Sequence, residues 1–191
     1  MTEAPSTPDV LCLTMNPAVD LATETESVVP THKLRCGDTL HDAGGGGVNV
    51  ARVLTRLGGH CVSVCPTGGP SGHWLEKRMR DEGLDSVFLP IADETRVSFT
   101  VHEHSTGAEF RFVMPGPHLS EAEWQAALRH LKGLQPFPAI VVASGSLPPG
   151  VPADFYARLA RLCRARGARM VLDTSGPALA AALAEGVYLF K

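Results

Sequence analysis

The chain has 191 residues, and its 17 Lys and Arg against 20 Asp and Glu give a formal net charge of −3. Apolar residues make up 44% of the sequence and charged residues 19%, a composition typical of a globular protein and too apolar for a disordered one. Because there is no basic excess, we expect neither nucleic acid nor an acidic membrane as a partner. An anionic ligand would need a local group of cations.

The first residues and the cysteines indicate in which cellular compartment the protein is expected. Residues 1–9 lack a basic segment followed by an apolar one, which predicts a flexible arm rather than a signal peptide. No apolar run approaches the roughly 20 residues of a membrane span. Five cysteines, an odd number, favour free thiols in the cytoplasm. A zinc site is one interpretation of Cys61 and Cys65 together with His60 and His73. Their spacing fits no common ligand pattern, so buried core cysteines are favoured.

The hydrophobic pattern alternates between strands and helices along the chain. Short apolar runs predict buried strands at 10–14, 61–65, 139–143, 169–172 and 187–190. Helical spacing and capping signals predict helices that end near 57 and that span about 71–82, 119–132, 152–166 and 177–184. This order predicts a three-layer α/β/α fold, in which helices cover both faces of a mostly parallel sheet.

Residues 97–113 interrupt the alternation. Two alternating runs, 97–101 and 110–113, flank a polar turn and predict a β-hairpin with one apolar and one polar face. Such a hairpin suits a small separate sheet over the main domain. His102 and His104 share one face of it, so a metal site is open there, although an exposed or interface position is favoured.

Three polar segments begin where a predicted strand ends, at 16–20, 144–150 and 173–176. Ligands of open α/β sheets bind beyond the carboxyl ends of the strands. Each segment alone is equally explained as a capped loop. Together, with two carboxylates and two hydroxyls, they predict a cup for a polyhydroxylated ligand.

Four consecutive glycines, Gly44 to Gly47, open the first helix and are followed by Asn49. The run is no Walker loop, since no Lys-Ser or Lys-Thr follows, and it is no dinucleotide fingerprint either. Glycines at a helix start allow close backbone approach and offer open amides to hydroxyl or phosphate oxygens. Taken alone, the run is equally a flexible turn.

The motif at 45–51, Gly-Gly-Gly-Val-Asn-Val-Ala, is followed by Gly58 and Gly68 at family intervals. With it, the sequence resembles the ribokinase-like (PfkB) carbohydrate kinases. The resemblance continues in order through most of the chain, at 16–20, 33–36, 95–96, 112–116, 144–150 and 173–176.

The resemblance implies a ribokinase-like fold in which residues 10–191 are the N-terminal part of the domain. It implies a β lid built from about 19–36 and 87–114, and a homodimer formed through that lid. The implied activity is ATP-dependent phosphorylation of a sugar phosphate with Mg²⁺, with 6-phosphofructokinases most similar. Alternatives are a 1-phosphofructokinase, a tagatose-6-phosphate kinase, or a non-catalytic sugar-phosphate-binding or regulatory protein.

The same resemblance implies roles for single residues. Asp20 and Asn49 would hold sugar hydroxyls, with Gly45 and Gly46 against the sugar, and Asp173 would complete the substrate site. The sugar's phosphate would be held by Arg96 together with Lys33, Arg35 or Ser146, because arginine binds phosphate in a bidentate manner. For Lys33 and Arg35, a solvated edge strand is an equal alternative. Lys191 matches a family lysine that approaches ATP phosphates.

Two family motifs do not occur in the sequence. One is Gly-Ala-Gly-Asp, whose Asp deprotonates the acceptor hydroxyl, and the other is Asn-x-x-Glu, which orders magnesium. We therefore expect no catalytic base and no metal ligand within these residues, and little activity from the chain alone. The expectation is a C-terminally incomplete kinase, whether a fragment, a frameshift product or a short homologue.

Overall fold

The computed structural model describes residues 8–191, so most of the arm expected at 1–9 lies outside the described residues. The main sheet has six parallel strands in the order β10-β9-β8-β1-β4-β5. Their bounds are β1 Val10–Leu13, β4 Cys61–Thr67, β5 Ser86–Pro90, β8 Ile140–Ser144, β9 Arg169–Asp173 and β10 Leu189–Phe190.

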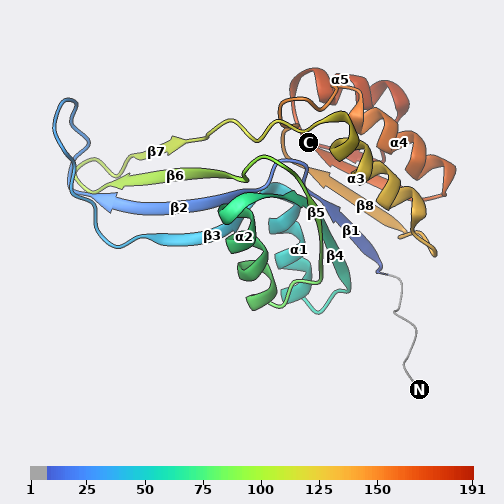
Figure 1. The fold of residues 1–191 in the computed structure, drawn as a ribbon, viewed down its shortest axis with the longest axis horizontal. Coiled ribbons are helices and arrows are strands. Elements are labelled where there is room, and N and C mark those ends of the chain that lie inside the picture. Colours follow the sequence, from blue (N-terminus) through green and yellow to red (C-terminus); the bar gives the residue numbers. More distant parts are fainter. Residues whose placement is uncertain (1–7) are drawn as a thin grey trace.

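Five helices cover the two faces of this sheet, and the predicted α/β/α layering is confirmed (Figure 1). They are α1 Gly46–Arg56, α2 Gly69–Asp81, α3 Glu121–Gly133, α4 Phe155–Ala165 and α5 Gly176–Glu185. Helices α1 and α2 lie on one side, and α3, α4 and α5 lie on the other (Figure 1). No helix within residues 8–191 combines the length and the apolar character needed to cross a membrane.

The core follows from the alternation of side chains along the central strand. Leu11 and Leu13 of β1 face α3–α5 and join the largest cluster of buried side chains. Cys12 faces α1 and packs with Ala51 and Cys61. All five cysteines are free, and each except Cys36 is buried, in agreement with the core-cysteine interpretation.

A second sheet projects from the main domain where the lid was expected, and it is called the lid below (Figure 1). Its order is β3-β2-β6-β7, with the bounds β2 Ala18–Thr25, β3 Leu40–Gly44, β6 Arg96–Glu103 and β7 Glu109–Phe112. The predicted hairpin is confirmed as the antiparallel pair β6 and β7. β6 also pairs in parallel with β2, which lies far earlier in the sequence.

The lid boundaries differ from the expected 19–36 and 87–114. Residues 86–90 form β5 of the main sheet, because Val87 and Leu89 pack into the main core and Phe88 packs beside α2. The segment 40–44 instead belongs to the lid as β3, antiparallel to β2. Residues 26–36 lie outside the lid's strands, in the connection from β2 to β3.

Candidate functional site

The three polar strand-end segments meet at one edge of the main sheet. β1, β8 and β9 are neighbours, so their carboxyl ends lie side by side. Asn16, after β1, donates from Nδ2 to Oγ of Ser146, after β8, at 3.1 Å. Ser144 donates to Oδ2 of Asp173 at 3.0 Å. The expected convergence is therefore present in the fold.

The glycine run is required where α1 begins against these strand ends. Gly45 has a φ of 123°, a region that side chains rarely adopt. A Cβ atom on Gly46 would lie 2.0 Å from Oγ of Ser144, and one on Gly47 would lie 2.5 Å from Oγ1 of Thr14. Packing thus explains part of this motif, and a Cβ atom on Gly45 would likewise lie 2.6 Å from Cγ2 of Thr14.

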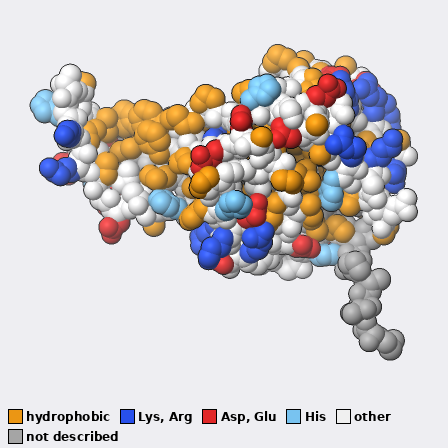
Figure 2. Space-filling model, in the orientation of Figure 1, with side chains coloured by type: hydrophobic (Ala, Val, Ile, Leu, Met, Phe, Trp, Pro, Cys, Tyr) orange, Lys and Arg blue, Asp and Glu red, His pale blue; other side chains and the backbone are white. Residues whose placement is uncertain are grey.

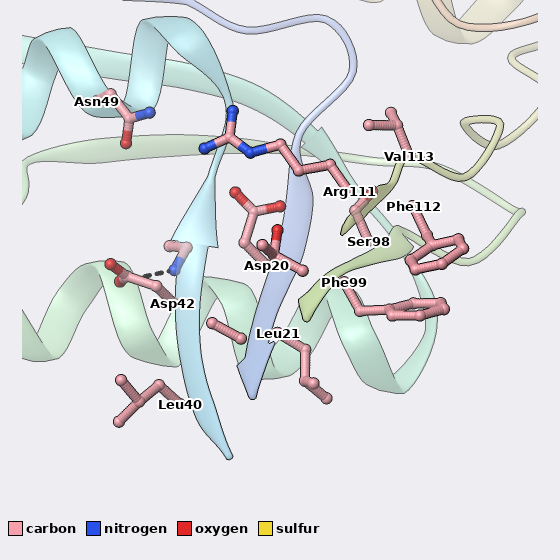
Figure 3. A pocket seen from close by; sticks show the side chains of 13 residues that line it. Asp20, Leu21, Leu40, Asp42, Asn49, Ser98, Phe99, Arg111, Phe112 and Val113 are labelled. Atoms are coloured by element: carbon pink, nitrogen blue, oxygen red, sulfur yellow. Dashed lines mark hydrogen bonds between the residues drawn. The ribbon is translucent and has the colours of Figure 1, made fainter. Parts of the chain in front are cut away.

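A cavity of about 540 Å³ lies at the base of the lid (Figure 3). The strand register places its polar residues on one face, since Asp42, Asp20 and Ser98 are successive partners across β3, β2 and β6. Thr100 and Arg111 form the next pair on that face. Asn49 of α1 reaches the cavity from the main domain, so the two parts of the fold line it together.

Asp20 is a carboxyl group in the lining of this cavity and keeps part of its surface open to solvent. Burial raises its pKa above the ordinary value, and the nearby Asp42 raises it further. The cations Arg96, Arg52 and Arg111 act in the opposite direction. Asp20 is thus a carboxylate held among positive groups, suited to accept hydrogen bonds from ligand hydroxyls.

Arg96 opens β6 and joins the lid to the strand-end edge. Its Nη1 donates to the carbonyl oxygen of Met114 at 3.0 Å, and its Nη2 donates to that of Asn16 at 2.9 Å. Its Nε is buried without a partner. Burial lowers the pKa of Arg96, while Asp20 opposes that shift. In this structure Arg96 therefore orders the base of the lid as well as contributing charge to the site.

Asp20, the glycine run and Arg96 come together as expected. Ala18 pairs with Gly44 on one side and with Arg96 on the other, two positions before Asp20. A Cβ atom on Gly44 would lie 2.0 Å from Oδ2 of Asp20.

Two expected basic residues lie away from this cluster within the chain, and a third lies at the strand-end edge. Lys33 and Arg35 are exposed in the connection after β2, and the carbonyl of Arg35 accepts a hydrogen bond from Thr25 at the strand's far end. Thr25 is five residues beyond Asp20, which is roughly 16 Å along a strand. Lys191 follows β10, and its backbone nitrogen donates to Leu172 at 2.9 Å, which places it at the same carboxyl edge as Asp173.

Sequence reasoning missed Asp42, Ser98 and Arg111 as residues of the cavity. The strand 40–44 has only five residues and no strong strand pattern, which hid the pairing of Asp42 with Asp20. Arg111 alternates with Phe110 and Phe112, and that alternation alone indicated a polar position on the opposite face of the hairpin.

The site combines carboxylates, an amide, hydroxyls and cations around one cavity, the groups that bind a polyhydroxylated anion. Within residues 8–191, no group of three or more His, Cys, Asp and Glu side chains is arranged to hold a metal ion. No chemical step is assigned to a metal here.

Comparison with known proteins identifies the family. The model of the pfkB family carbohydrate kinases matches residues 11–191. The chain belongs to the PfkB family of carbohydrate kinases.

Relatives and solved structures within the family are more specific. An ATP-dependent 6-phosphofructokinase isozyme 2 of Mycobacterium tuberculosis is 47% identical over 184 residues, covering 96% of this chain and 54% of that protein. The crystal structure of Escherichia coli phosphofructokinase-2 in complex with fructose-6-phosphate matches with a TM-score of 0.90 at 37% identity, covering 97% of this chain and 61% of that one. The tetrameric inhibited form of the same enzyme matches with a TM-score of 0.89 at 37% identity, over 96% and 60%. The chain spans about half the length of the curated relative.

Proposed function

We propose that this chain is the sugar-phosphate-binding part of an ATP-dependent 6-phosphofructokinase. In the complete enzyme the terminal phosphoryl group of ATP passes to the free primary hydroxyl of fructose 6-phosphate, giving fructose 1,6-bisphosphate and ADP. The observation that carries the proposal is the cavity that Asp20, Asn49 and Arg111 line together. The similarity to 6-phosphofructokinases along nearly all of this chain supports the choice of substrate.

The roles proposed for the residues follow their positions. Asp20 and Asn49 bind sugar hydroxyls, while Arg96 and Arg111 supply positive charge for the phosphate. Ser146 and Asp173 lie along the strand-end edge, and Gly45, the N-cap of α1, is proposed to lie with Gly46 against the sugar. Lys191, at the same edge, is proposed to approach the phosphates of ATP, which with Mg²⁺ would be held largely by residues beyond this chain.

We also propose that a second copy of the chain covers the lid. Hydrophobic side chains gather over the lid in Figure 2. Leu40 and Val113 are 73% and 70% exposed, and Phe99 and Phe112 stack at 4.6 Å on the lid's other face. Exposed apolar surface of this kind marks an interaction site.

Free thiols at all five cysteines support a reducing compartment, the cytoplasm.

Titration calorimetry of the 191-residue chain with fructose 6-phosphate tests the proposal. We expect saturable binding to the wild type and loss of binding in Asp20→Asn, with fructose as the control for the phosphate. Fusion to the C-terminal half of a relative should then give ATP-dependent turnover of fructose 6-phosphate. A wild-type chain that binds no hexose phosphate, and a fusion that turns none over, would reject the proposal.

A further inference from the structure

Arg52 lies at the centre of a polar network beneath the cavity. It is on α1, one turn after Asn49, and its side chain is only 11% exposed. Its Nε donates to Glu82 at 2.6 Å, and its Nη2 donates to the carbonyl of Ala43 at 2.7 Å and to Asp42 at 3.2 Å. Its Nη1 donates to Oδ1 of Asn49 at 2.6 Å. Four different partners thus fix one guanidinium group.

The contact with Asn49 determines which end of that amide faces the cavity. A guanidinium has only donors, so it can donate to the amide oxygen but cannot form a hydrogen bond with the amide NH₂. With Oδ1 held by Arg52, the Nδ2 hydrogens are the groups left for a ligand. In Figure 3 the nitrogen of Asn49 lies on the side toward Arg111. An inverted amide would place donor against donor at 2.6 Å.

We propose that Arg52 is a positioning residue that holds the Asn49 amide with its NH₂ directed into the cavity. Asn49 then acts as a hydrogen-bond donor, so that the ligand presents an oxygen lone pair at this position. Asp20 on the opposite wall is an acceptor when ionised. The two walls therefore select a ligand that accepts at one side and donates at the other, as a sugar with several hydroxyls does. This inference rests on the proposed function.

A purely structural role for Arg52 is the competing explanation, because its other partners tie α1 to β3 and to the residue after α2. A double-mutant cycle separates the two. Fructose 6-phosphate is titrated calorimetrically into the wild-type chain, Arg52→Gln, Asn49→Ala and the double variant. Arg56→Gln, on the exposed side of the same helix, is the charge-matched control.

We expect Arg52→Gln to weaken binding about tenfold when Asn49 is present and less than about twofold in the Asn49→Ala background. Arg56→Gln should bind as the wild type does. Equal losses in both backgrounds, or no loss in either, would overturn the proposal. If Arg52→Gln does not fold, Asn49→Asp takes its place: it keeps an oxygen for Arg52 but has no NH₂ to donate, so it should bind as weakly as Asn49→Ala, and binding at the wild-type level would overturn the proposal.

A ligand-free measurement keeps this inference separate from the proposed function. In ¹H–¹⁵N spectra, the side-chain amide signals of Asn49 are assigned by their disappearance in Asn49→Ala. We expect them to shift in Arg52→Gln and to stay in place in Arg56→Gln. Unchanged signals in Arg52→Gln would overturn the proposal even where the sugar phosphate binds. Shifted signals in a chain that binds no sugar phosphate would support the orientation and reject the proposed function.

Discussion

Gly44 leaves room for the carboxylate of Asp20. The two residues lie on adjacent antiparallel strands, and a Cβ atom on Gly44 would be 2.0 Å from Oδ2 and 2.3 Å from Cγ of Asp20. Real Cβ atoms do not approach this closely, so any larger residue at position 44 displaces the carboxylate.

We therefore expect Gly44→Ala to weaken fructose 6-phosphate binding at least tenfold while the chain stays folded. The backbone of Gly44 has no positive φ, and the three atoms nearest to an added Cβ all belong to the Asp20 side chain. Gly133→Ala is the matched control, because a Cβ atom there meets nothing within 4 Å. Calorimetric binding and thermal unfolding of both variants check this. Undiminished binding in Gly44→Ala would show that the position of Asp20 is immaterial.

The raised pKa of Asp20 predicts a pH-dependent gain in stability for Asp20→Asn. Since the folded-state pKa lies above the ordinary 3.8, the ionised carboxylate costs stability at neutral pH. Asparagine removes that cost, so Asp20→Asn should be more stable than the wild type at pH 7. The difference should shrink as the pH falls through the folded-state pKa and vanish below 3.8.

Urea unfolding of the two chains from pH 7 to pH 3.5 measures this difference. Asp38→Asn serves as a comparison, because Asp38 is an exposed carboxylate in the connection from β2 to β3 and its removal should change stability little. A wild type that is more stable than Asp20→Asn at pH 7 would mean that the surrounding arginines outweigh the cost of burial.

Arg96 and Arg111 should differ in how they affect stability and binding. Arg96→Ala breaks two charged hydrogen bonds to backbone carbonyls, so we expect the free energy of unfolding to fall by about 2 kcal/mol and binding to weaken. Arg111 has a 71% exposed side chain and a loose ion pair with Glu109, so Arg111→Ala should leave stability nearly unchanged.

Paired urea unfolding and calorimetry distinguish these outcomes. Equal stability losses in the two variants would contradict the structural role of Arg96. If Arg111→Ala binds fructose 6-phosphate as the wild type does, the phosphate does not lie on the lid side of the cavity.

The exposed apolar positions of the lid predict self-association. Leu40→Asp and Val113→Asp each place a charge where a second copy would bury the side chain, so we expect each to convert the dimer to a monomer. Val53→Asp on α1, also exposed at 53%, lies outside the lid and should leave the dimer intact. Sedimentation analysis reads the three variants, and a wild-type monomer at tens of micromolar would contradict the proposed pairing.

The main domain was predictable because its signals are local. Short apolar runs predict buried parallel strands. Apolar spacing and capping residues predict helices, as Ser120 and Glu123 do for α3. The lid was harder to predict, because residues 40–44 form a strand only through their pairing with β2. The site followed the same division. Asp20 and Asn49 were marked by motifs, whereas Asp42 and Arg111 depend on a register that no single segment encodes.

The positions of Lys33 and Arg35 within the chain could not be predicted from the motif. Their residue types suit a phosphate, yet their distance from Asp20 is set by the length of β2 and by the path of the connection that follows it. That path is decided by tertiary contacts rather than by the local sequence.

The parallel pairing of β2 with β6 affects how the chain folds. Each strand belongs to its own hairpin, but residues 26–95 separate the two, and that interval contains α1, β4, α2 and β5. Bringing β2 and β6 together closes this long loop, which costs chain entropy before the hydrogen bonds between the two strands can offset it. The lid should consequently assemble late, after α1 and α2 have docked, and hydrogen exchange should report slower protection in β2 and β6 than in β1 and β4. A ligand enclosed by the lid would then bind only to chains in which α1, β4, α2 and β5 have already packed together.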